Sequence, residues 1–193
     1  MKKFEFTGET KTLLDGTVLH RIEALVHIEF GCMAVEIGEL GGWIEKENNL
    51  SHDGNAWVFR NAEVYGNARV YGNARVCDDA RVCDDASVYG NAEVCGDARV
   101  CGDAEVFRME HYLAIGPIGS RNAFTTFFRT KERNIKVVCG CFFGTIDEFL
   151  AKVKQTHGDS KHAKVYRAAV EVALTQLEDV KNEDIEEKER DEI

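Results

Sequence analysis

The stretch that decides the fold is residues 54–107, which read GNAWVF RNAEVY GNARVY GNARVC DDARVC DDASVY GNAEVC GDARVC GDAEVF. It consists of nine consecutive hexads without an insertion, and every hexad has alanine in its third position and valine in its fifth. A period of six fits neither the period of an α-helix nor the alternation of an ordinary β-strand. Self-similarity of this kind indicates a solenoid, in which each repeat stacks on its neighbours.

A coil with a triangular cross-section explains the period. Each hexad makes one side, so three hexads (18 residues) make one turn and the repeat makes about three turns. The valine points into the coil on each side. The alanine lies near a corner, and the Gly-Asn, Gly-Asp or Asp-Asp pair before it tolerates the left-handed backbone angles that a corner requires.

Residues that are 18 apart should stack on successive turns of such a coil. Opposite charges then face each other across neighbouring rungs, as Glu63 and Arg81 do, and such pairs add modest support to the stack. Three external columns also follow: Tyr71, Tyr89 and Phe107; Phe59, Cys77 and Cys95; and Tyr65, Cys83 and Cys101.

The seven cysteines are expected to be thiols, because no secretion signal precedes them. Within the columns, Cys77 with Cys95 and Cys83 with Cys101 are close enough to oxidise if their side chains converge. A structural zinc site needs four ligands around one point. Two stacked pairs on different faces do not supply them, so we expect no metal site.

The repeat resembles the hexapeptide-repeat family of left-handed β-helix proteins, and the likeness covers residues 54–107. The resemblance implies a mainly β protein built on a left-handed parallel β-helix. Members of that family commonly form homotrimers with parallel coil axes. We therefore expect a homotrimer whose interface contains Tyr71, Tyr89 and Phe107. The alternative is that these aromatic side chains only cover the flank of their own coil.

Residues 1–53 are expected to form a β-rich N-terminal cap, because open β-helix rungs template aggregation and need covering. Asp15 and Gly16 give a hairpin signal. The stretches LGGWIE (40–45), NLS (49–51) and GNAWV (54–58) resemble the cap of hexapeptide-repeat proteins often carried by phages and prophages. The resemblance implies that the cap plugs the end of the coil, with Trp43 and Trp57 in its core.

Residues 108–177 are expected to form an α+β C-terminal module, followed by an acidic tail over residues 178–193. The module resembles one found on the same phage and prophage proteins, in residues 115–128, 139–149 and 156–163. The expected elements are strands over residues 112–115, 124–129 and 135–143, a helix over 146–156 with Thr145 as its N-cap, and a helix ending near Leu177 whose apolar face includes Val165, Ala169 and Val172.

Charge is distributed unevenly along the chain. The net charge of −10 is made up of −5 in residues 1–53, −4 in the repeat, +5 in residues 108–177 and −6 in the tail. The basic module is where an anionic partner would bind. Overall acidity argues against duplex DNA as a partner. Because no apolar run spans a membrane and no signal-peptide core is present, we expect a cytoplasmic protein without a membrane partner.

A glycine-rich loop in the basic module, residues 116–122, is the best candidate for an anion site. Its backbone N–H groups can point at one anion, and its serine and arginine add side-chain donors. The alternative is a plain connecting loop with the arginine on the surface. The expected ligand-binding residues are Gly119, Ser120, Arg121 and Asn122 from the loop, joined by Thr125, His157 and Lys161 from nearby elements.

These features favour a non-enzymatic, oligomeric binding protein of phage type that sequesters an anionic nucleotide-type signal of host defence. The alternative is a structural or protein-interaction scaffold that inhibits or recruits a host protein. A third class, the hexapeptide acyltransferase, uses a histidine base near the coil, and this coil has no histidine between His52 and His111. The pair Cys139 and Cys141 lacks the C-x-x-C spacing of redox motifs and is expected to share one packed strand face. No catalytic residue and no cofactor are expected.

Overall fold

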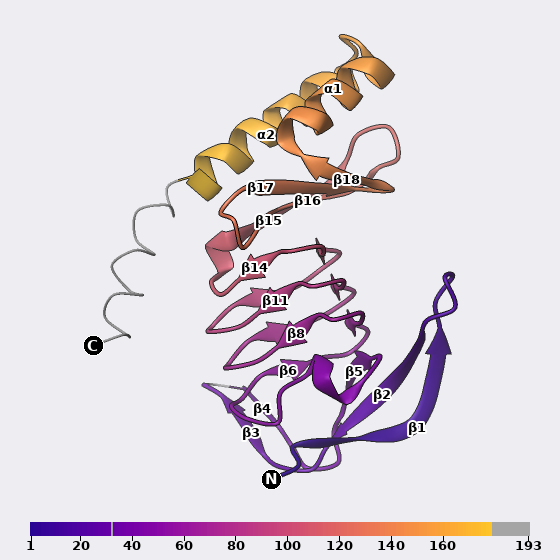
Figure 1. Ribbon diagram of the computed structural model, residues 1–193, viewed down its shortest axis with the longest axis vertical. Helices are drawn as coiled ribbons and strands as arrows, with labels where there is room; N and C mark the ends of the chain where they lie inside the picture. The colour runs from indigo at the N-terminus through magenta and orange to yellow at the C-terminus, as the bar shows by residue number, and fades with distance from the viewer. Residues whose placement is uncertain (32, 179–193) are drawn as a thin grey trace, which may run out of the picture. The chain divides into compact units, whose positions relative to one another are not determined.

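The computed structural model describes residues 1–31 and 33–178 of the chain. The fold is mainly β and contains a parallel β-solenoid of about four turns and a C-terminal helical module (Figure 1). The chain divides into two compact units, one of residues 1–109 and one that begins at Glu110. The expected acidic tail, apart from Glu178, lies outside the described residues. Among the described residues, neither helix has the length and apolar character needed to cross a membrane.

The repeat forms a coil of parallel rungs. Each hexad contributes a two-residue strand that ends at its valine, and strands 18 residues apart pair, as Glu63 does with Arg81. The predicted stacking is therefore confirmed. All the alanines and valines of the repeat are at most 1% exposed and make the core. The strands are β6 (Trp57–Val58), β7 (Glu63–Val64), β8 (Arg69–Val70), β9 (Arg75–Val76), β10 (Arg81–Val82), β11 (Ser87–Val88), β12 (Glu93–Val94), β13 (Arg99–Val100) and β14 (Glu105–Val106).

The coil begins before the repeat, which raises the expected three turns to about four. The strand β5 (Leu40–Ile44) pairs in parallel with β7, and Leu50 forms a parallel bridge with Val70. Glycine at position 42 permits this stacking, because a Cβ atom there would lie 2.7 Å from the carbonyl oxygen of Ala62. The segment expected to cap the coil thus also supplies part of it.

Two buried polar side chains close the start of the coil. Asn49, in the short helix η1 (Glu47–Asn49), donates from its amide to the carbonyl oxygens of Gly66 and Ala68 at 3.2 and 2.8 Å. The Nζ atom of Lys3 donates to the carbonyl oxygens of Gly54 and Ala56 at 3.2 and 2.8 Å. These bonds satisfy backbone acceptors of the first hexads that would otherwise be buried without partners.

A long antiparallel hairpin extends one face of the coil. Its strands are β1 (Phe4–Thr12) and β2 (Val18–Ala24), and β2 also pairs with β5, so this face becomes a six-stranded sheet. The hairpin turn contains Gly16 at φ +91°, as the Asp-Gly signal predicts. A smaller hairpin joins β3 (Ile28–Phe30) to β4 (Met33–Val35).

The two tryptophans of the N-terminal unit differ in their surroundings. Trp57 is fully buried, as expected. The expectation that Trp43 lies in the core is wrong, because its ring is only half-buried and packs against two cations. Lys11 Nζ lies 4.6 Å and the Arg21 guanidinium carbon 5.1 Å from the centre of the Trp43 ring. Cation–π contacts of this kind keep an indole ring at a partly polar surface.

The C-terminal unit is a four-stranded antiparallel sheet with two helices. The strands β15 (Tyr112–Ile118), β16 (Ala123–Arg129), β17 (Ile135–Cys139) and β18 (Phe142–Thr145) pair in chain order. The expected strand over residues 135–143 is therefore two strands, because Gly140 turns the chain at φ +63°. The short helix η2 (Met109–His111) precedes them, and β15 runs three residues further than expected.

Both helices cover one face of this sheet (Figure 1). The helix α1 (Ile146–His157) begins after Thr145, whose side chain accepts from the backbone N–H of Glu148, so the predicted cap is confirmed. The helix α2 is Lys161–Glu178. Val172 is 51% exposed, so the expected apolar face is wrong at that position. The buried core contains Phe127, Val137, Phe149, Val153, Ala163, Tyr166, Ala169, Val170, Ala173 and Leu177.

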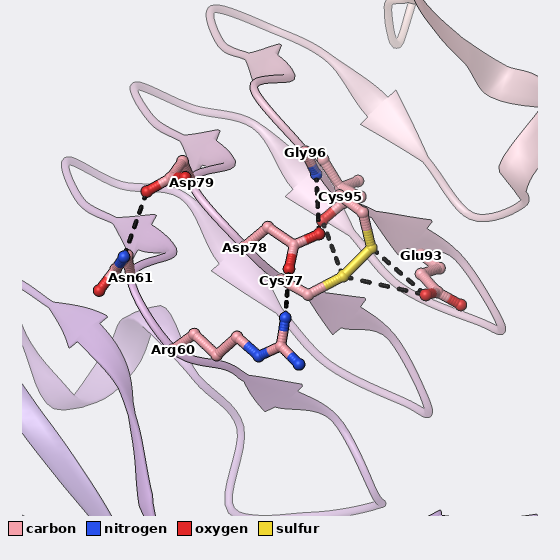
Figure 2. A network of polar contacts seen from close by, with 9 residues as sticks. Arg60, Asn61, Cys77, Asp78, Asp79, Glu93, Cys95 and Gly96 are labelled. Carbon is pink, nitrogen blue, oxygen red and sulfur yellow. Dashed lines mark hydrogen bonds and ion pairs between the residues drawn. A yellow bond between two sulfur atoms is a disulfide. The ribbon is translucent and has the colours of Figure 1, made fainter.

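The external columns of the coil form as predicted. The ring centres of Tyr71 and Tyr89 lie 4.9 Å apart with planes inclined by 1°, and Phe107 stacks on Tyr89 at 5.4 Å. Cys77 and Cys95 form a disulfide (Figure 2). This corrects the expectation of thiols for that pair, and it follows from the stacking, which places their Cα atoms 4.6 Å apart. Among the described cysteines, the other four are free thiols: Cys83, Cys101, Cys139 and Cys141.

Candidate functional site

A cavity of about 260 Å³ lies in the C-terminal unit, between the loop after β15, the turn between β17 and β18, and the two helices. The loop and the turn bring polar groups to one side, and the helices bring apolar and basic side chains to the other. The lining residues are Ser120, Arg121, Cys139, Cys141, Phe142, Phe149, Lys152, Val153, Thr156, His157 and Tyr166.

The side chain of Arg121 is positioned by the turn between β17 and β18. Its Nη2 atom lies 3.9 Å from the Sγ atom of Cys141. A Cβ atom on Gly140 would come within 3.0 Å of the guanidinium group, so the guanidinium packs directly on the glycine backbone. The interaction with Cys141 raises the pKa of Arg121, so this group is a permanent cation at the cavity wall.

Tyr166 of α2 organises the inner side of the cavity. The thiol of Cys139 donates to the hydroxyl oxygen of Tyr166 at 3.8 Å. Burial raises the pKa of Tyr166, so its hydroxyl keeps its proton at neutral pH. Gly119 lies against this hydroxyl so closely that a Cβ atom on the glycine would be 1.8 Å from Tyr166 Oη. The loop can therefore reach the helix only with glycine at position 119.

The lining of the cavity has one sign of charge. Arg121, Lys152 and His157 carry its ionisable cationic groups, and no aspartate or glutamate is among its lining residues. A concave site with cations and without carboxylates favours an anion, because the field is not neutralised locally. The phenyl ring of half-buried Phe142 adds an apolar surface beside these groups.

The structure brings together only part of the expected site. Ser120, Arg121 and His157 line the cavity, and Gly119 supports it from behind through Tyr166. Thr125 is fully buried and donates to the Sγ atom of Cys139 at 3.3 Å, so it acts behind the wall. Two further expected residues, Asn122 and Lys161, are exposed and lie outside the cavity lining.

The expected role of the loop backbone is wrong for one of its N–H groups. The N–H of Asn122 donates to the carbonyl oxygen of Gly119 at 3.4 Å. This donor is used inside the protein, because the left-handed residues Gly119 and Asn122 fold the loop back on itself. An anion in the cavity must then be bound mainly by side chains.

Sequence reasoning missed several lining residues. Lys152 and Thr156 are one helical turn apart on α1, next to the core residues Phe149 and Val153. This spacing places them at the edge of the buried helix face. This helical spacing can be read from the sequence. Which loop the edge of the helix faces depends on the order of the strands in the sheet, and the sequence does not give that order. Cys139 and Cys141 were expected to share one packed face, whereas Cys139 is half-buried and Cys141 is exposed at the turn.

A larger open hollow of about 770 Å³ lies in the N-terminal unit beside η1 and β8. Its lining mixes charges, with Lys46, His52 and Arg69 near Glu47. Glu47 pairs with His52 at 3.0 Å and with Lys2 at 3.2 Å, and these contacts lower the pKa of Glu47. The hollow is therefore partly neutralised and is a weaker candidate for an anion.

Comparison with known proteins assigns no family to this chain. No protein-family model matches it, and a search of the curated proteins gave no match.

Proposed function

We propose that this protein is a non-enzymatic, oligomeric binding protein that sequesters a small anionic ligand of nucleotide type in the C-terminal cavity. The observation that carries the proposal is the presence of Arg121, Lys152 and His157 in the lining of a cavity without a lining carboxylate. Phosphate groups are bound by such cations through charge-assisted hydrogen bonds, and arginine binds them in a bidentate manner.

The size and apolar lining narrow the ligand class. A volume of about 260 Å³ lies just below the range of about 300–1,000 Å³ that is usual for small-molecule sites. It suits a phosphate group with a single ring, and it is small for a dinucleotide enclosed by one chain. Phe142 offers a ring to stack on, and the Tyr166 hydroxyl is a protonated donor in the same lining.

The β-helix supports two further parts of the proposal, which are the phage origin of the protein and its assembly into a homotrimer. The resemblance of the repeat and its flanking segments to phage-type proteins supports a phage-encoded protein in the host cytoplasm. A homotrimer joined along Tyr71, Tyr89 and Phe107 would carry several identical cavities. Binding without turnover at several cavities per assembly would remove a nucleotide-type defence signal from the host by mass action.

Calorimetric titration of the full-length protein tests the proposal. The probes are inorganic phosphate, linear and cyclic mononucleotides, and a cyclic dinucleotide. We expect saturable binding of a mononucleotide, and a loss of about tenfold or more in affinity for Arg121→Ala, because one charge-assisted hydrogen bond is removed. Lys161→Ala is the matched control, since Lys161 is a basic residue of the same unit outside the cavity. Binding of none of these probes, or equal losses in both variants, would contradict the proposal.

A protein-interaction scaffold is the second candidate, and the N-terminal hairpin favours it. Leu14 at the hairpin turn is fully exposed, and Phe6 and Val18 are about 40% exposed. Apolar side chains on a projecting hairpin mark a surface for a protein partner. Affinity capture from host lysate with wild type, Leu14→Asp and Arg121→Ala separates the two functions. A scaffold loses its partner only in Leu14→Asp, whereas a nucleotide-binding protein loses its ligand only in Arg121→Ala.

A further inference from the structure

One external column of the coil places two free thiols on neighbouring rungs. Tyr65, Cys83 and Cys101 follow the paired valines of β7, β10 and β13. The backbone N–H of Cys83 donates to the carbonyl oxygen of Val100 at 3.0 Å, which fixes the two cysteines side by side. The sulfur atoms of Cys83 and Cys101 lie within 4.8 Å of each other.

A carboxylate joins this pair from the adjacent corner. Asp84 lies 3.8 Å from Cys83, measured from Oδ2 to Sγ. The same oxygen accepts from the backbone N–H of Gly102 at 3.0 Å, which orients the carboxylate toward the next rung. The two sulfur atoms and a carboxylate oxygen all lie within 4.8 Å of one another.

The neighbouring face of the coil shows what distinguishes this column. There the equivalent cysteines, Cys77 and Cys95, are joined by a disulfide, and the equivalent aspartate, Asp78, pairs with Arg60 at 2.8 Å (Figure 2). In the column of Cys83, the position equivalent to Arg60 is Gly66, which has no side chain. No arginine from the preceding turn therefore pairs with the Asp84 carboxylate, which stays beside the two thiols.

We propose that Cys83, Cys101 and Asp84 bind a thiophilic divalent cation of the zinc class. Thiolate and carboxylate are both zinc ligands, and a tetrahedral ion with Zn–S distances of about 2.3 Å separates its sulfur ligands by about 3.8 Å. The observed 4.8 Å limit on the three ligand atoms is compatible with that separation. The fourth position is open to water or to the Tyr65 hydroxyl. Binding releases the remaining thiol protons to solvent, with no change in oxidation state.

The proposal departs from the expectation from sequence that no metal is bound. That expectation counted only the cysteines of each column. The added ligand comes from the residue that follows Cys83, and its direction depends on the corner conformation, in which Asp84 has φ +59°.

Cadmium titration of the reduced full-length protein tests the proposal, because thiolate–cadmium bonds absorb in the ultraviolet. The background variant carries Cys77→Ser and Cys95→Ser, so that Cys83 and Cys101 are the only stacked cysteine pair left in the coil. We expect this protein to bind a Cd²⁺ ion whose affinity falls about 100-fold or more in Cys83→Ser and about tenfold in Asp84→Asn. Asp78→Asn, on the neighbouring face, is the matched control and should leave the affinity unchanged.

Asp84→Asn protects the test against misfolding, because asparagine readily adopts the positive φ of this corner and keeps the shape of the side chain. Equal Cd²⁺ affinity in the background protein, Cys83→Ser and Asp84→Asn would overturn the proposal. It would also be overturned if Cys83 and Cys101 oxidise to a disulfide in air equally fast with and without Cd²⁺, since a coordinated thiolate is protected from oxidation.

Discussion

The Nζ atom of Lys3 lies 2.8 Å from the carbonyl oxygen of Ala56, 53 residues away, in a place where the lysine side chain is only 3% exposed. Burial lowers the pKa of Lys3 from 10.5 to about 8. The start of the β-helix is therefore closed by an amine that is close to losing its proton, and the stability of the coil becomes dependent on pH.

Lys3 is predicted to make the protein more stable as the pH rises from about 8 to 10.5. Below pH 8 the amine is charged in both states, and folding bears the cost of burying the charge. Between the two pKa values only the unfolded chain binds the proton, so the free energy of unfolding rises by about 1.4 kcal/mol per pH unit from this group. Urea denaturation of wild type and Lys3→Met across this range measures the difference. We expect the free energy of unfolding of wild type, minus that of Lys3→Met, to increase with rising pH. A value that stays flat or decreases would contradict the assignment.

Glu63 is predicted to be the ion-pair residue with the largest effect on stability in the N-terminal unit. It is 7% exposed and pairs with Lys11 and with Arg81, each at 2.9 Å, so it fastens the hairpin to the coil. We expect Glu63→Gln to lower the free energy of unfolding by about 1–2 kcal/mol at neutral pH, since both partners are partly exposed.

The exposed pair of Arg60 and Asp78 is the control for Glu63. Removing it with Arg60→Ala should cost about 0.5 kcal/mol or less in the same denaturation experiment. Equal losses in the two variants would show that Glu63 does not join the hairpin to the coil.

Gly119→Ala is predicted to destabilise the C-terminal unit and to weaken ligand binding. The new methyl group would lie 1.8 Å from Tyr166 Oη, in addition to the strain of φ +73°. The backbone strain alone costs about 1–2 kcal/mol. Gly96→Ala isolates that part, because Gly96 has φ +70° and no atom within 4 Å of its Cβ position. Thermal unfolding and phosphate or nucleotide titration should show a larger loss for Gly119→Ala, and similar losses would rule out the Tyr166 contact as the cause.

The stacked rings of Tyr71 and Tyr89 are predicted to lie in the interface of the homotrimer. Replacing both tyrosines by serine should shift the protein toward monomer in sedimentation velocity, because the apolar stripe is lost. Tyr65→Ser changes the equivalent position on another face of the coil and should leave the assembly intact. A double variant that sediments like wild type would show that these rings cover only their own coil.

The sequence predicted the coil well because the repeat is local and redundant. Each Ala-x-Val hexad has the same preference, so a single period fixes the strand positions, the buried residues and the stacking of Tyr71 on Tyr89. The prediction was short by one turn, because the contribution of β5 depends on Gly42 packing under the first hexads and has no hexad pattern of its own. Trp43 was misplaced for a related reason: the cations that cover it, Lys11 and Arg21, come from the hairpin.

The candidate site was predicted only in part. The glycine, serine and arginine of one loop correctly indicated one wall of the cavity. The basic charge of the module led to the expectation that the cavity binds an anion. The opposite wall comes from α1 and α2, and its position depends on the order in which the strands of the sheet pair. The sequence assigned the loop N–H groups to an anion, because the folding back of the loop, in which the N–H of Asn122 donates to Gly119, could not be read from the sequence.

The sequence by itself determined the β-helix, its core of alanine and valine, the columns of residues 18 apart and the net positive charge of residues 108–177. These properties follow from periodicity and composition, which need no knowledge of distant contacts. Only the tertiary structure decided that Lys3 closes the coil, that Asp84 joins Cys83 and Cys101, and that Lys152 and His157 line the same cavity as Arg121. Each of these depends on side chains meeting across separate elements, and their distances are set by packing of the whole unit.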